Sequence, residues 1–134
     1  MITKIKQQII DEVFKIDKGA RLIYLFGSYA QGLQNEQSDI DIAVLFSIKK
    51  TKKEIFDMSQ NLAVTLNSDI DLISLNEADT DIKIQIIKKG ILLFENEKDF
   101  HLGFEMRLLK EYQMLNEERS VVLESKFGDK IWKQ

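Results

Sequence analysis

The chain has 134 residues, of which 44% are hydrophobic and 31% charged, and its net charge is −3. This length and balance are typical of one globular domain, and the net charge gives no electrostatic indication of non-specific nucleic-acid binding. The sequence contains no cysteine, which excludes disulfides and thiolate metal sites. No apolar run approaches the ~20 residues of a membrane span, and the charged N-terminal segment has helical spacing rather than the pattern of a signal peptide. We therefore expect a single cytoplasmic domain over residues 1–134.

Helical and strand patterns alternate along this domain. The predicted helices cover residues 2–16, a segment that begins with the capping-box pair Thr51 and Glu54, residues 81–89 and residues 99–127. The last of these is either one long helix or two helices broken near Asn116 or Ser120. The predicted strands cover residues 21–26, 39–46, 69–75 and 91–95. This order predicts an α/β (α+β) fold, in which helices flank a small mixed β-sheet.

Two short motifs mark the facing ends of the first two predicted strands. Gly27-Ser28 ends the first strand, and Asp39-Ile40-Asp41 opens the second. Because side chains alternate along a strand, Asp39 and Asp41 point to one face, with their Cα atoms roughly 6.5 Å apart. Either motif alone also suits a capped turn or a solvated strand face. Asp is disfavoured in strands, however, so two at alternate positions of an apolar run indicate a site.

The chemistry of these motifs suits a metal-bound nucleoside triphosphate. Mg²⁺ prefers oxygen ligands and is commonly held by one or two carboxylates together with substrate phosphates. Gly27 lets the backbone approach a phosphate closely, and Ser28 offers a hydroxyl beside it. A third carboxylate, Asp71, is placed to complete the metal site and to accept the proton of an incoming hydroxyl. Asp69 lies on the same face of the third predicted strand, so spacing alone does not decide between them.

The stretch that carries these motifs resembles the nucleotidyltransferase superfamily, whose fold is shared with DNA polymerase beta. The signature of that superfamily is a Gly-Ser turn, a spacer of about ten residues, an Asp-x-Asp strand and an acidic residue on a later strand. Gly27, Ser28, Asp39 and Asp41 match it directly, and Asp71 with the apolar residues after it fits the third position. The resemblance implies that the three Asp residues are catalytic and hold Mg²⁺, while the Gly-Ser turn binds the triphosphate of ATP.

The whole chain is also similar to the minimal nucleotidyltransferases, through its short length, the tetrapeptide SDID at residues 38–41 and the stretch at residues 86–95. Many members of that group are antitoxins encoded beside a helical HEPN-type ribonuclease toxin. The resemblance implies a protein adenylyltransferase that transfers AMP from ATP to toxin tyrosine and so neutralises the ribonuclease. Two alternatives stay open: a non-catalytic antitoxin that acts by stoichiometric binding, and transfer to a small hydroxylated molecule.

Residues 97–134 form a C-terminal helical segment with an apolar stripe. The members of the stripe are Phe100, Phe104, Leu108, Leu109, Tyr112 and Leu115. Their helical spacing predicts that they face the core. Apolar residues continue beyond the stripe, from Val121 to Trp132. Exposed apolar surface of that extent indicates an interface, either between copies of the chain or with the toxin.

Overall fold

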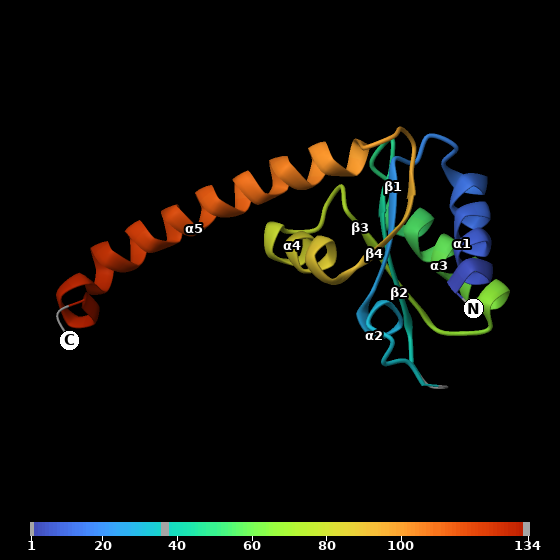
Figure 1. The fold of residues 1–134 in the computed structure, drawn as a ribbon, viewed down its shortest axis with the longest axis horizontal. Coiled ribbons are helices and arrows are strands. Elements are labelled where there is room, and N and C mark those ends of the chain that lie inside the picture. Colours follow the sequence, from blue (N-terminus) through green and yellow to red (C-terminus); the bar gives the residue numbers. More distant parts are fainter. Residues whose placement is uncertain (1, 36–37, 133–134) are drawn as a thin grey trace.

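The structure, a computed structural model, describes residues 2–35 and 38–132, and the side chains of residue 2 and of residues 123–132 lie outside that description. The strands are β1 (Leu22–Phe26), β2 (Ile40–Leu45), β3 (Ile70–Ser74) and β4 (Ile91–Glu95). The helices are α1 (Ile2–Ile16), α2 (Gly27–Ala30), α3 (Lys52–Leu66), α4 (Thr80–Lys89) and α5 (Phe100–Trp132). The strands form one sheet in the order β3-β2-β1-β4, with β1 antiparallel to both neighbours and β2 parallel to β3. This mixed sheet with flanking helices confirms the predicted α/β (α+β) fold (Figure 1).

The two faces of the sheet are covered by different helices. In Figure 1, α1 and α3 lie on one side of the sheet, and α4 with the first turns of α5 lies on the other. Ile42, Val44 and Leu62 belong to the buried cluster beneath α1 and α3. Tyr24 and Ile86 belong to the cluster on the opposite face. Because both faces are buried, a strand such as β1 reads as a continuous apolar run rather than an alternating one.

The helix starts show how local sequence sets the boundaries. The Thr51 hydroxyl accepts a hydrogen bond from the Glu54 N–H at 3.1 Å, and the Glu54 carboxylate accepts one from the Thr51 N–H at 2.9 Å. This complete capping box confirms the predicted start of α3. Helix α4 begins at Thr80, one residue earlier than predicted, because the Asp79 carboxylate caps it by accepting from the Ile82 N–H at 3.0 Å.

The central strands are shorter than the sequence predicts. The ladder between β2 and β3 begins at the pair Ile40 and Ile70. Asp39 and Asp69 therefore stand just before the ladder rather than inside it. A carboxylate at that position keeps its hydration, which burial between two strands would remove. Two acidic side chains consequently meet at one open end of the sheet.

Helix α5 is continuous, without a break at Asn116 or Ser120. Its first turns are anchored to the sheet, since the buried Tyr24 hydroxyl donates a hydrogen bond to the Glu105 carboxylate. The predicted core-facing stripe is confirmed at Leu108, which is buried, and is wrong at Leu109, which is 45% exposed. The two residues differ because successive side chains point about 100° apart around a helix.

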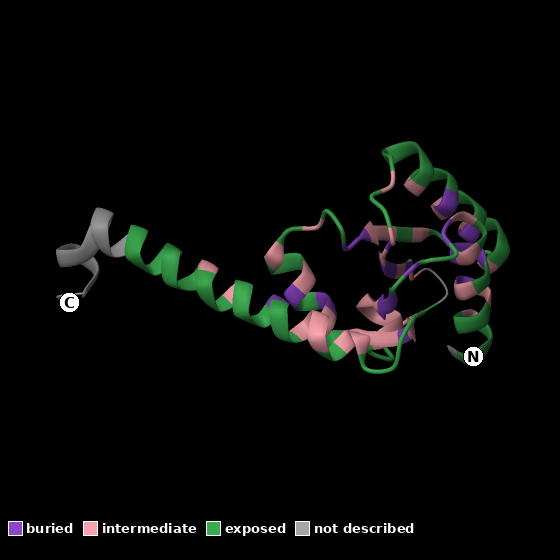
Figure 2. Cartoon of the chain, turned by 90° about the horizontal axis from the view of Figure 1, so that it is seen from above, coloured by how far each residue is buried: buried purple, intermediate pink, exposed green. Residues whose placement is uncertain are grey.

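Beyond its first turns, α5 extends away from the sheet as a mostly exposed rod (Figure 2). An ion pair between Arg119 and Asp81, 2.9 Å long, connects it to α4. Its large exposed hydrophobic side chains are Leu102, Met106, Leu109, Met114, Val121 and Val122. The other apolar positions of the predicted interface, from Leu123 to Trp132, lie outside the described side chains. Neither α5 nor another helix of the described part of the chain combines the length and apolarity needed to cross a membrane.

A buried carboxylate connects the end of α1 to the end of β2. Asp17 accepts hydrogen bonds from the Ser47 N–H at 2.8 Å, the Ser47 hydroxyl at 2.7 Å and the Gly19 N–H at 2.9 Å. The Lys50 ammonium lies 3.7 Å from the same carboxylate. Burial raises the pKa of Asp17, but the hydrogen bonds from Ser47 and Gly19 and the charge of Lys50 outweigh it and hold the pKa below its usual value.

We expect Asp17→Asn to lower the free energy of unfolding by about 1.5–3 kcal/mol at pH 7, because an uncharged amide accepts these bonds less well. Since the folded-state pKa lies below the unfolded-state value, the contribution of the carboxylate is present above the unfolded-state pKa and is lost as the pH falls through the folded-state pKa. Urea titrations should therefore show a smaller difference between variant and wild type in acid than at pH 7. The exposed Asp11→Asn is the control, with an expected change of at most about 0.5 kcal/mol. An equal decrease in the free energy of unfolding at both pH values would contradict the role of the charged Asp17 carboxylate.

Candidate active site

The site begins at the turn that follows β1. Gly27 has a φ of 69°, in the left-handed region that favours glycine. A Cβ atom added there would lie 1.9 Å from Oδ2 of Asp41, far closer than any side chain allows. The turn is closed by the Leu33 N–H, which donates to the Ser28 carbonyl at 2.9 Å. The Asp41 carboxylate therefore occupies the space that a side chain at position 27 would fill.

Strand register then sets the positions of the acidic residues. Asp41 pairs with Phe26 of β1 on one side and with Asp71 of β3 on the other. Paired residues point to the same face of a sheet, here the face that α4 and α5 partly cover. Asp39 lies two residues before Asp41 and belongs to the same face, where its side chain is exposed. The structure thus brings together the Gly-Ser turn and all three acidic residues that the sequence predicts.

The environment of Asp41 disfavours its negative charge. Burial raises its pKa, and the neighbouring carboxylates of Asp71 and Asp39 and a hydrogen bond with Asp71 raise it further, to about 6. The Asp41 carboxyl, whose ordinary pKa is 3.8, therefore loses its proton less readily than a carboxyl in water. Crowded carboxylates of this kind attract a proton or a cation.

The donor atoms of this cluster fit a hard divalent cation. All are carboxylate oxygens, the ligands that Mg²⁺ prefers, and a bound cation would offset the charge repulsion that raises the pKa of Asp41. Within the described residues, no three Asp, Glu, His or Cys side chains are already arranged as a metal site. A bound cation would therefore have to bring these carboxylates into its own coordination geometry. The residues therefore fit Mg²⁺ chemically, with ligand geometry that the ion itself would complete.

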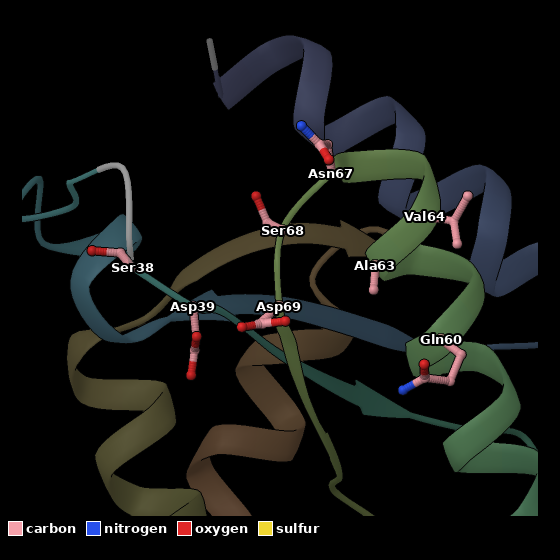
Figure 3. Close-up of a pocket in the computed structure, with 8 residues that line it drawn as sticks. All are labelled: Ser38, Asp39, Gln60, Ala63, Val64, Asn67, Ser68 and Asp69. Carbon is pink, nitrogen blue, oxygen red and sulfur yellow. The ribbon is translucent and has the colours of Figure 1, made fainter.

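The structure separates the two candidates for the third acidic position. Asp71 lies in register with Asp41, and its carboxylate is close enough to raise the pKa of Asp41. Asp69 lies before β3 instead, beside Asp39 in a polar cavity of about 620 Å³ (Figure 3). The cavity is lined by Ser38, Asp39, Gln60, Ala63, Val64, Asn67, Ser68 and Asp69.

Sequence reasoning did not find the side chains that α3 contributes to this cavity. Gln60 comes from the body of the helix, and Asn67 ends it in the left-handed conformation, with a φ of 50°. Asn is the non-glycine residue that tolerates this conformation best, which is the one local signal for Asn67. Gln60 carries no signal, because its place in the cavity wall depends on how α3 packs against the sheet.

The sequence matches the family described as polymerase beta, nucleotidyltransferase, over residues 7–99. A protein adenylyltransferase of Shewanella oneidensis, MntA, is 39% identical over 104 residues, which are 78% of this chain and 74% of that protein. A putative protein adenylyltransferase of Methanocaldococcus jannaschii is 31% identical over 90 residues, 67% of this chain and 95% of that protein. The chain therefore belongs to the polymerase-beta-type nucleotidyltransferase family.

Solved structures agree with this family and with the predicted fold. A crystal structure of a toxin–antitoxin pair with AMP-PNP contains a chain that is 36% identical, with a TM-score of 0.80, covering 90% of this chain and 96% of that one. A tri-AMPylated Shewanella oneidensis HEPN toxin in complex with its MNT antitoxin contains a chain that is 32% identical, with a TM-score of 0.77, covering 93% and 98%. The resemblance to minimal nucleotidyltransferases of HEPN/MNT pairs is thereby confirmed.

Gly27→Ala tests the close approach of the turn to Asp41. We expect nucleotidyl transfer to fall by about 10²-fold or more, because the new methyl group displaces a carboxylate of the site by an ångström or more. Gly32→Ala is the matched control: Gly32 also has a positive φ, 70°, but nothing lies within 4 Å of an added Cβ. It should lose about 1–2 kcal/mol of stability from backbone strain and keep its activity. Equal activity of two folded variants would contradict the role of Gly27.

Proposed function

We propose that the chain is an Mg²⁺-dependent protein adenylyltransferase that transfers AMP from ATP to tyrosine hydroxyls of a HEPN-type ribonuclease toxin and thereby neutralises it. The observation that carries the proposal is the cluster of Asp41 and Asp71 against the Gly27 turn, on a fold of the nucleotidyltransferase family. Relatives solved as toxin–antitoxin complexes, one with AMP-PNP and one with an AMPylated HEPN toxin, support the donor and the acceptor.

In this proposal the three acidic residues share the metal. Asp39, Asp41 and Asp71 would hold Mg²⁺, because they supply only oxygen donors and their mutual repulsion favours a cation. Bound Mg²⁺ would neutralise charge that develops on the phosphates during the displacement. Gly27 and Ser28 would hold the triphosphate, through the open backbone of the turn and the Ser28 hydroxyl.

The transfer is an in-line displacement at the α-phosphorus of ATP. A bond forms between the tyrosine oxygen and the α-phosphorus, and the bond from that phosphorus to the bridging oxygen of the β-phosphate breaks. Pyrophosphate leaves with the bonding electron pair, and the product is a phosphodiester between AMP and tyrosine. Asp71 accepts the hydroxyl proton, since its side chain is exposed and lies next to Asp41.

An open site suits an acceptor that is itself a macromolecule. Asp39 and Asp71 are both exposed, so a large partner can reach them without a deep pocket. A protein acceptor brings its own surface for recognition, whereas a small molecule needs an enclosed pocket to bind it. ATP as the donor also supports a cytoplasmic location for the reaction.

The function of residues 97–134 as a contact for a partner or a second copy stays a prediction. Its support is the projecting helix α5, whose described part exposes Met106, Met114, Val121 and Val122. Apolar side chains on one exposed helix are common in interfaces. A toxin docked there would be held beside the enzyme while its tyrosine reacts.

Asp41→Asn tests the enzyme directly. ATP labelled on the α-phosphate is incubated with Mg²⁺, the purified chain and the HEPN-type ribonuclease encoded beside it, and label on the ribonuclease is counted. We expect the variant to lose at least about 10³-fold in rate, because it removes a charged ligand at the centre of the site. Asp57→Asn, at an exposed position on α3 paired with Lys53, is the control and should retain the rate.

Each result of that assay has a defined meaning. Label with the wild type that disappears with folded Asp41→Asn supports the proposal. Wild-type rates from Asp41→Asn would contradict the assigned site. If the chain binds the ribonuclease tightly and inhibits it but no label appears on the ribonuclease, the chain is a binding antitoxin rather than an enzyme.

A further inference from the structure

Strand β3 is an open edge of the sheet. It pairs with β2 on one side, and among the described residues no strand pairs with its other side. The Ile40 N–H donates to the Asp69 carbonyl at 2.9 Å, and the Leu75 N–H donates to the Val44 carbonyl at 2.8 Å. Odd-numbered residues of this segment therefore bond to β2, and by alternation the backbone groups of its even-numbered residues point outward.

Two even-numbered residues, Ile70 and Leu72, thus offer N–H and C=O groups to a further strand. The next one, Ser74, has its carbonyl occupied by the Glu77 and Ala78 N–H groups of the following turn, at 3.2 and 3.0 Å. The open part of the edge is therefore the part nearest the acidic cluster. Asp71 lies between the two available residues.

A groove runs along this edge, with helices on both sides. It has a volume of about 540 Å³ and is lined by Lys52, Ile55, Phe56, Ser59, Ile70, Asp71, Leu72, Ile73, Ser74, Glu77, Ala78 and Ile82. Phe56 of α3 is 60% exposed and Ile82 of α4 is 42% exposed, so both walls present apolar side chains to solvent. Exposed apolar walls above free backbone groups are the features that an added strand uses.

The groove leads into the candidate active site. Asp71 lines it, and the polar cavity that contains Asp39 and Asp69 continues along α3 toward Asn67. From Lys52 to Asn67 the α3 wall is about 22 Å long at helical rise. An extended peptide covers that length with about six or seven residues.

We infer that an extended segment of the acceptor protein binds as a fifth strand along β3 and so delivers its tyrosine to the acidic cluster. The inference rests on the proposed function, of which it specifies the acceptor site. A peptide residue opposite Asp71 points to the same face as Asp71 and Asp41. Its side chain then has to cross one strand spacing, about 4.8 Å, which a tyrosine can do.

The same geometry specifies the neighbours of the tyrosine. The peptide residue opposite Leu72 points to the α3 side, where Phe56 is exposed. The residue opposite Ile73 points to the α4 side, where Ile82 is exposed. An acceptor segment therefore has apolar residues one and two positions from its tyrosine.

Charge argues against a second copy of the chain as the occupant. Pairing β3 with β3 of another copy would bring Asp69 and Asp71 of both copies to one seam. Like charges that face one another on paired strands are destabilising, so this pairing is unfavourable. An acceptor segment without acidic residues meets no such penalty.

The first test changes the groove walls. Phe56→Glu and Ile82→Glu should each raise KM for the HEPN-type ribonuclease by at least tenfold, since a charge replaces apolar contact, while the affinity for ATP stays within twofold. Ile48→Glu is the matched control, because Ile48 is 71% exposed and lies outside the groove. Its KM should equal that of the wild type. Wild-type KM values from both groove variants would overturn the inference.

The second test measures protection of the backbone amides at the β3 edge and does not depend on catalysis. Amide hydrogen exchange is followed by NMR with and without the same ribonuclease, in the absence of ATP. Exchange at Ile70 and Leu72 should slow at least tenfold in the complex, whereas Asp71 and Ile73 are already bonded to β2. The inference is overturned if the complex forms and the Ile70 and Leu72 amides remain unprotected. It is also overturned if these amides become protected without the ribonuclease as the concentration of the chain is raised, because a second copy then occupies the edge. Protection without transfer of label would uphold the groove and reject the proposed function, so the two failures are distinguishable.

Discussion

The candidate site depends on one packing constraint, the placement of the Asp41 carboxylate between the Gly27 turn and Asp71. Register fixes both neighbours: Asp41 lies opposite the last residue of β1 on one side and opposite Asp71 on the other. A Cβ atom at position 27 would overlap this carboxylate, so any residue other than glycine would displace Asp41. The resulting crowding raises the pKa of Asp41 to about 6 and makes a cation favourable there. The two central strands β1 and β2 are otherwise free of charged residues, and Asp41 with Asp71 places negative charge at one end of the sheet.

The helices determine which parts of the sheet remain accessible. The pair α1 and α3 covers one face and the pair α4 and α5 covers the other (Figure 1). Among the described residues, no strand pairs with the outer edges of β3 and β4, and the β3 edge is the one that carries Asp71. A site carried on strands is rigid, and rigidity keeps reacting groups in line. Recognition of a protein acceptor can then use adjoining surfaces, the groove beside β3 and the projecting helix α5.

Much of this arrangement can be predicted from the local sequence, whereas the rest depends on tertiary packing. Helix starts, the strand order along the chain and the Gly-Ser and Asp-x-Asp motifs follow from capping residues and periodicity. Asp69 and Asp71 cannot be separated in the same way, since a period of two places both on one face, and only the register with Asp41 distinguishes them. Leu109 follows the apolar period but faces solvent, because α5 leaves the sheet. The groove at Phe56 forms only when α3 and α4 flank the same edge.

The measurement that tests the central claim most directly is a crystal structure of the chain with an ATP analogue and Mn²⁺, located by its anomalous scattering. We expect the metal between the carboxylates of Asp39 and Asp41, with Asp71 beside it and the triphosphate on the turn at Gly27 and Ser28. Metal and nucleotide bound at other residues, with these carboxylates left without a ligand, would contradict the claim.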